Sequence, residues 1–246
     1  MKQKFESITL PCIAGAAGLS ALFLEVWLLY FGRDDKGLIV KSHPANPLLW
    51  VLTLGVLAAL FLLTRKIHPR VRSYVRTFPA SVWGAAGTVA AAAGILYLTL
   101  PELLSDADLL TRICDIFGLL AAASLLFTGW ARFKGFRLNT LFHVLVCLFF
   151  ALWTMRCYRT WSNDPQISDY CFPLLANIAM MLTFYHRATF DLRMGNRRSY
   201  QFFRLTALYF CTAAIPAGGA CYAAFAFWMA ANPAHTDTPA ETPDSQ

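Results

Sequence analysis

Long apolar segments follow one another along this chain, and they constrain its fold more than any other feature of the sequence. Each segment is close to the roughly 20 residues that an α-helix needs to cross a hydrocarbon layer about 30 Å thick. Because they are continuously apolar rather than alternating, they predict transmembrane helices and not barrel strands. The predicted spans cover residues 8–31, 47–64, 80–100, 110–130, 140–156, 169–190 and 204–230.

The predicted fold class is therefore all-α, a polytopic transmembrane bundle of seven helices over residues 1–231. The composition agrees, since 57% of the residues are hydrophobic and 14% are charged, whereas soluble proteins carry about 25% charged residues. These values exclude a soluble enzyme, a secreted disulfide scaffold and a disordered protein. Only residues 232–246, rich in Pro, Thr and acid, predict a disordered tail.

The distribution of cations predicts the orientation. Fifteen of the 21 Lys and Arg residues fall in segments on the side of the N-terminus. The positive-inside rule then places the N-terminus in the cytoplasm and, with seven spans, the C-terminus outside. The net charge of +7 follows from this bias and indicates attraction of the cytoplasmic loops to anionic lipid, not to nucleic acid. The six other cations are Arg33, Lys36, Lys41, Arg112, Arg156 and Arg159.

An internal repeat is a second hypothesis. A gapless shift of 126 residues places the first three spans on the last three, and it matches Trp27 with Trp153, Arg33 with Arg159, and Arg-Ser-Tyr at 72–74 with 198–200. The interpretation is a 3+1+3 parallel repeat, the arrangement of some transporters, with residues 110–130 as the linker. The alternative is that any two such spans share an outer Trp and an inner Arg.

Glu25 is the acid that lies within the apolar part of a span, and it is the clearest functional pointer. A carboxylate at that depth is costly unless it faces a cavity or a cation, and Arg112, Arg156 and Arg159 lie on the same side. The sequence predicts an outward-facing polar pocket. The alternative is a structural ion pair beneath a hydrated loop. The predicted pocket residues are Glu25, Arg112, Asp115, Arg156, Arg159, Trp161, Asp164, Asp169, Tyr170 and Asn177.

Two further groups carry hypotheses. A cytoplasmic basic patch, which could bind phosphate or a partner or simply anchor the protein, comprises His186, Arg187, Arg193, Arg197 and Arg198. Cys157 and Cys171 bracket an outer loop, and the sequence favours two free thiols at these helix ends. The alternative is a disulfide between them, which would contribute about 3 kcal/mol.

Catalytic and nucleotide-binding motifs are absent, and the sequence contains no metal or cofactor motif. The function that the sequence favours is a small-molecule transporter or substrate-binding permease subunit. The alternatives are an accessory membrane protein that binds a protein partner, and a membrane-embedded enzyme of lipid or envelope metabolism, for which no catalytic set can be assembled.

Two blocks carry a resemblance to a known family. They are GRDDKGLIVKSHP at 32–44, and WSNDPQISDY at 161–170 together with FYHRATFD at 184–191. The chain resembles an uncharacterised family of multi-pass membrane proteins from gut Firmicutes of the clostridial type. The resemblance implies a location in the bacterial cytoplasmic membrane and no particular function.

Overall fold

The computed structural model describes residues 8–34, 40, 43–67, 74–103, 108–162, 170–192 and 194–235 of the chain. This part is all-α, with eight long helices and one single turn, α4. The bounds are α2 Leu10–Phe31, α3 Ala45–Arg65, α4 Tyr74–Thr77, α5 Val82–Leu103, α6 Leu109–Lys134, α7 Leu141–Trp161, α8 Cys171–Asp191, α9 Arg197–Ala213 and α10 Ile215–Ala231.

Five of these helices, α2, α3, α5, α6 and α7, are long and apolar enough to cross a membrane, and α10 is apolar but shorter. A chain with several such helices in succession is a multi-pass membrane protein. The first six predicted spans each correspond to one helix, with ends that differ by up to five residues.

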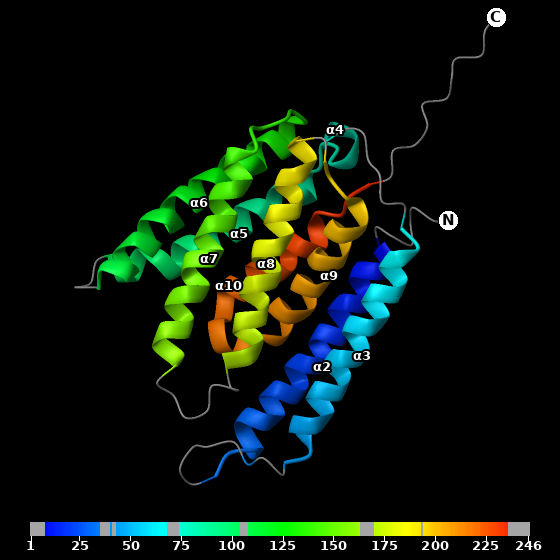
Figure 1. Ribbon diagram of the computed structural model, residues 1–246, viewed down its shortest axis with the longest axis vertical. Coiled ribbons are helices and arrows are strands. Elements are labelled where there is room, and N and C mark those ends of the chain that lie inside the picture. Colours follow the sequence, from blue (N-terminus) through cyan, green and yellow to red (C-terminus); the bar gives the residue numbers. More distant parts are fainter. Residues whose placement is uncertain are drawn as a thin grey trace, which may run out of the picture.

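The helices α5 to α10 form a closed ring, because each packs on the next and α10 packs on α5. The hairpin of α2 and α3 stands beside this ring and packs mainly on α9 (Figure 1). As a result, α9 has neighbours on two sides and is buried over nearly its whole length, although its first two turns are strongly polar.

The seventh predicted span was wrong, because residues 204–230 are not one helix. They belong to α9 and α10, which meet at Ala214 and run antiparallel, so that Tyr200 near the start of α9 donates to the carbonyl of Asn232 after α10. Pro216 is the physical reason: it lies in the first turn of a new helix, where its missing N–H costs nothing, rather than inside a kinked one.

This extra hairpin changes the relation between the chain ends. The start of α2 and the end of α10 lie at the same end of the bundle, which we call the terminal end (Figure 1). The ends of α2 and α9 lie at the other, the distal end. The prediction that the two termini lie on opposite sides of the membrane depended on seven spans and stays a prediction, because residues 1–7 and 236–246 lie outside the described residues.

The structure does not support the predicted 3+1+3 repeat. The helices α3 and α8 do begin and end 126 residues apart. The same shift, however, places the unbroken helix α5 on residues 208–229, which contain the turn between α9 and α10. The two triplets therefore differ in their third element.

Small residues allow close approach of the helices, as they do in membrane proteins generally. A side chain at Gly18 of α2 would meet Thr212 of α9 at 2.8 Å, and one at Gly87 of α5 would meet the Trp228 backbone of α10 at 3.2 Å. Within the ring the space is filled by aromatic rings, with Phe184 stacked on Trp228 at 4.5 Å between centroids.

The predicted tail begins too early. Asn232 and Ala234 are buried, and the Asn232 side chain donates to the carbonyls of Gly84 and Trp228 at 3.2 Å each. The packed chain therefore continues at least to His235, and the rest of the predicted tail lies outside the described residues.

Candidate functional site

A pocket of about 260 Å³ lies at the distal end of the bundle, between α2, the start of α8 and the α9–α10 turn. Its charged lining residues are Glu25 and Arg33, and Trp161 and Tyr170 line it with rings stacked at 4.5 Å between centroids. The rest of the wall is apolar. Glu25 thus lines a cavity.

The apolar wall has a simple origin. Leu28 and Leu29 follow Glu25 on α2, while Ala213, Ala214 and Ala217 come from the α9–α10 turn. Small alanines at this turn leave room that larger residues would fill.

A second cavity of about 110 Å³ shares Trp161, Pro173 and Ala217 with the first, so the two are adjacent. Asn177 and Tyr222 line it, and the Tyr222 hydroxyl donates to the Asn177 side-chain oxygen at 3.2 Å. Of the predicted pocket residues, the structure therefore places Glu25, Trp161 and Tyr170 at the first cavity and Asn177 at the second.

The backbone of α10 is interrupted beside these cavities. Gly219 has φ 54° and ψ −130°, a conformation open to glycine but not to residues with a side chain, and Gly218 next to it lines the second cavity. In a membrane protein, non-helical backbone is tolerated where it is buried in protein or lines a cavity.

Two predicted pocket residues form a different cluster. Arg156 of α7 forms an ion pair with Glu102 of α5 and lies 3.6 Å from Asp115 of α6, measured from Nη1 to Oδ1. Its guanidinium also lies 4.8 Å from the centroid of the Trp153 ring. This cluster joins three helices at a junction in which Asp115 is buried, Arg156 is largely buried and Glu102 is partly exposed.

The remaining predicted pocket residues do not line either cavity in the described structure. Arg159 forms an ion pair with Asp108 at 2.8 Å, and both side chains are largely exposed. Arg112 is exposed near the start of α6. Asp164 and Asp169 lie outside the described residues.

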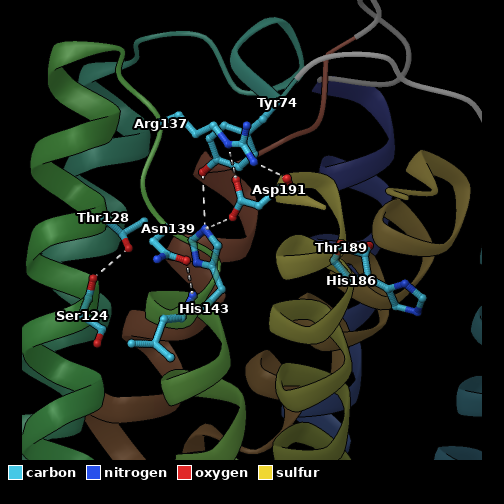
Figure 2. Close-up of polar contacts among 10 residues, drawn as sticks. Tyr74, Ser124, Thr128, Arg137, Asn139, His143, His186, Thr189 and Asp191 are labelled. Atoms are coloured by element: carbon cyan, nitrogen blue, oxygen red, sulfur yellow. Dashed lines mark hydrogen bonds and ion pairs between the residues drawn. The ribbon is translucent and has the colours of Figure 1, made fainter. Parts of the chain in front are cut away.

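A polar network closes the terminal end of the bundle. Figure 2 shows Tyr74, Arg137, His143 and Asp191 converging from α4, the α6–α7 loop, α7 and the end of α8. His143 Nε2 lies 3.4 Å from the Tyr74 hydroxyl and 3.8 Å from Asp191 Oδ2, while Arg137 Nε lies 3.4 Å from Asp191 Oδ1. The buried His143 and Asp191 thus join three helical elements.

The predicted basic patch is not one continuous surface. Arg187 and Arg197 are buried, whereas Arg198 is partly exposed and donates to the Arg65 carbonyl at 2.6 Å. His186 points away from the polar network in Figure 2 and stacks on Phe203 at 5.0 Å between centroids. Arg193 lies outside the described residues.

Arg197 and its neighbours fix the segment that follows α10. Arg197 donates to the Ala234 carbonyl through Nε at 3.2 Å and Nη2 at 3.1 Å, and Gln201 donates to the same oxygen at 3.0 Å. The backbone N–H of His235 donates to the Thr77 carbonyl at 2.9 Å. Burial, followed by the positive charges of the nearby arginines, lowers the pKa of the His235 imidazole.

Both Cys157 and Cys171 carry free thiols, the state that the sequence favoured over a disulfide. Among the described residues, no three His, Cys, Asp or Glu side chains gather closely enough to hold a metal ion.

Comparison with known proteins gives no match: no family model, no curated protein and no solved structure is similar to this chain. The resemblance to clostridial multi-pass membrane proteins therefore stays a prediction.

Sequence reasoning missed Arg33 as a pocket residue, and it missed Gly219. The position of Arg33, two residues after the end of the first predicted span, was a usable signal, since it is eight residues, or just over two turns, from Glu25. No sequence signal marks the conformation of Gly219, because Gly218 beside it reads the same.

Proposed function

We propose that this chain is a solute-binding membrane protein of the transporter class, with the pocket at Glu25 as its binding site. The observation that carries the proposal is the composition of that pocket: one acid, one arginine and a stacked Trp–Tyr pair against an apolar wall. Ligand sites typically combine such walls with a few fixed polar groups.

The position of Glu25 supports this function over a purely structural role. An acid within an apolar helix is costly, and such residues generally mark substrate or ion pathways. Glu25 borders a cavity, while the buried ion-pair cluster of α5, α6 and α7 is built from other residues, Glu102, Asp115 and Arg156.

The interruption of α10 supports transport in particular. Transporters commonly bind solutes at helices that are broken within the membrane. Here Gly219 breaks the helix beside two adjacent cavities, of which the second continues toward Asn177 and Tyr222. If the terminal end is cytoplasmic, as the distribution of cations favours, the pocket takes solute from outside the cell.

The test is a thermal-shift screen of the purified full-length protein in detergent. The screen contains zwitterionic amino acids, quaternary amines, carboxylates and neutral sugars, and a ligand that binds the folded state raises the melting temperature. We expect a charged compound to do so, and expect Glu25→Gln and Trp161→Ala to abolish the shift.

Two control variants make the screen specific. Glu102→Gln makes the same change outside the pocket, and Trp83→Ala removes an exposed tryptophan of α5. Both should keep the shift. A shift that survives in the pocket variants, or the absence of any shift across the panel, would contradict the proposal.

A further inference from the structure

Arg187 lies at the terminal end of the bundle, far from the pocket, and its environment is unusual. The side chain has no exposed surface, and its guanidinium lies 5.0 Å from the Phe78 ring centroid and 5.2 Å from that of Trp228. Tyr74, Tyr200 and Asp191 interact with it electrostatically, Tyr74 also through a side-chain hydrogen-bond contact. Within 3.5 Å, its Nε, Nη1 and Nη2 atoms have no hydrogen-bond partner in the described part of the chain.

A second buried arginine lies against the same aromatic ring. The Arg132 guanidinium is 5.6 Å from the Phe78 centroid. Its Nη1 donates to the Pro79 carbonyl, but Nε and Nη2 are buried and have no partner among the described residues. Two guanidinium groups thus approach one phenyl ring with five buried nitrogens left to satisfy.

Among the described residues, the buried charges around this pair do not balance. Four arginines are buried at the terminal end, Arg132, Arg187, Arg197 and Arg204, against the one buried acid of the described residues there, Asp191. Backbone carbonyls accept from Arg197 and Arg204, at Ala234 and Met229. Arg137 is the ion-pair partner of Asp191.

An uncompensated buried cation is strongly unfavourable, and each unmet guanidinium N–H adds to the cost. Stacking on Phe78 and Trp228 satisfies the faces of the Arg187 guanidinium but not its N–H edges. The described residues therefore provide no negatively charged acceptor within hydrogen-bond distance of these N–H groups. A guanidinium group can donate two parallel hydrogen bonds to two oxygen atoms of a phosphate group. Two guanidinium groups therefore suit an acceptor with several such oxygens.

We propose that Arg187 and Arg132 bind a phosphate group at the terminal end of the bundle. The phosphate belongs either to the headgroup of an anionic phospholipid or to a free phosphate ion, and the same N–H donors would serve both. The site is independent of the Glu25 pocket and does not depend on its function.

The experiment compares the wild-type full-length protein with Arg187→Gln and Arg132→Gln, after delipidation in detergent. Arg198→Gln is the matched control, because Arg198 is partly exposed and donates to a backbone carbonyl nearby. Melting temperatures are measured with inorganic phosphate against chloride at equal ionic strength, and in nanodiscs of phosphatidylglycerol against phosphatidylcholine.

We expect phosphate or phosphatidylglycerol to raise the melting temperature of the wild type and of Arg198→Gln. In the Arg187 and Arg132 variants the apparent affinity should fall at least about tenfold, since each lost charge-assisted hydrogen bond is worth about that factor. A rise with inorganic phosphate assigns a free ion, and a rise confined to phosphatidylglycerol assigns a lipid headgroup.

A further signature separates binding from a structural role. Without phosphate, Arg187→Gln should be at least as stable as the wild type, because it removes an unpaired charge. With phosphate it should be less stable. If the variant is less stable under both conditions, or if neither anion source shifts the wild type, or if both variants respond like Arg198→Gln, the proposal is wrong.

Discussion

Replacement of Arg156 by methionine should destabilise the protein strongly. Arg156 is the cation between Glu102 and Asp115, and the side chains of Arg156, Glu102 and Asp115 are 16%, 35% and 0% exposed. Methionine keeps much of the apolar volume but leaves the Asp115 carboxylate buried without a cation. Breaking a buried pair in this way typically costs about 3 to 5 kcal/mol.

The same helix supplies a matched control. Arg159 pairs with Asp108 at 2.8 Å, but the two side chains are 66% and 59% exposed. An exposed pair contributes at most about 1 kcal/mol, so Arg159→Met should have a small effect. Both variants remove one arginine from α7, but Arg156→Met breaks its pairs with Glu102 and the buried Asp115, whereas Arg159→Met breaks one exposed pair.

The assay is equilibrium unfolding in mixed detergent micelles, followed by tryptophan fluorescence. Arg156→Met should lower the free energy of unfolding by several times the effect of Arg159→Met. The double variant Arg156→Met with Asp115→Asn should recover part of the loss, because the stranded charge is gone. Equal losses for the two single variants, or no recovery in the double variant, would refute the reasoning.

Three other expectations can be checked by the same unfolding measurements. Gly219→Ala should lower the free energy of unfolding by about 1 to 3 kcal/mol, because alanine must adopt φ 54°. The control Gly55→Ala should be neutral or stabilising, because nothing lies within 4 Å of the added side chain. A similar change in the free energy of unfolding for both variants would contradict this prediction. The lowered pKa of His235 means that the unfolded chain binds the proton more readily than the folded one. The free energy of unfolding should therefore be highest above about pH 6.5 and should decrease as the pH drops below this value. If the melting temperature of His235→Gln falls with pH as much as that of the wild type, His235 is not the cause. Tyr209→Phe removes the 2.8 Å hydrogen bond to Thr53 that joins α9 to α3, and should cost about 1 kcal/mol; no loss would show that the bond is not formed.

The sequence predicted the helical spans well where hydrophobicity alone decides the structure. Six spans appear as single helices because each is a continuous apolar run that ends in polar residues. The last run failed for a specific reason: hydropathy continues unbroken through Ala214, so a turn inside the apolar stretch leaves no polar signal. Pro216 was the available marker, and it indicates a helix start as readily as a kink.

The same ambiguity affected α9. Its first two turns contain Arg197, Gln201 and Arg204, and these polar residues indicated a loop before the predicted span. In the structure these side chains are buried because the segment after α10 returns to accept their hydrogen bonds. Such a contact depends on a hairpin that local sequence does not reveal.

The candidate pocket was predicted in part. A carboxylate such as that of Glu25 is unfavourable in the hydrocarbon region unless it faces a cavity or a cation, so its position beside a cavity could be inferred. Which cations lie near which acids could not, because the rotation of each helix decides it. That is why Arg156 and Arg159 were assigned to the pocket, although the structure pairs them with other carboxylates.

The most direct test of the central claim is a cryo-EM map of the full-length protein, with the compound that gives the largest thermal shift. We expect ligand density between Glu25, Arg33 and the Trp161–Tyr170 pair, and we expect this density to be absent in Glu25→Gln under the same conditions. Ligand density elsewhere in the protein would contradict the proposed binding site. The same holds if the compound is bound but the Trp161 and Tyr170 side chains close the pocket.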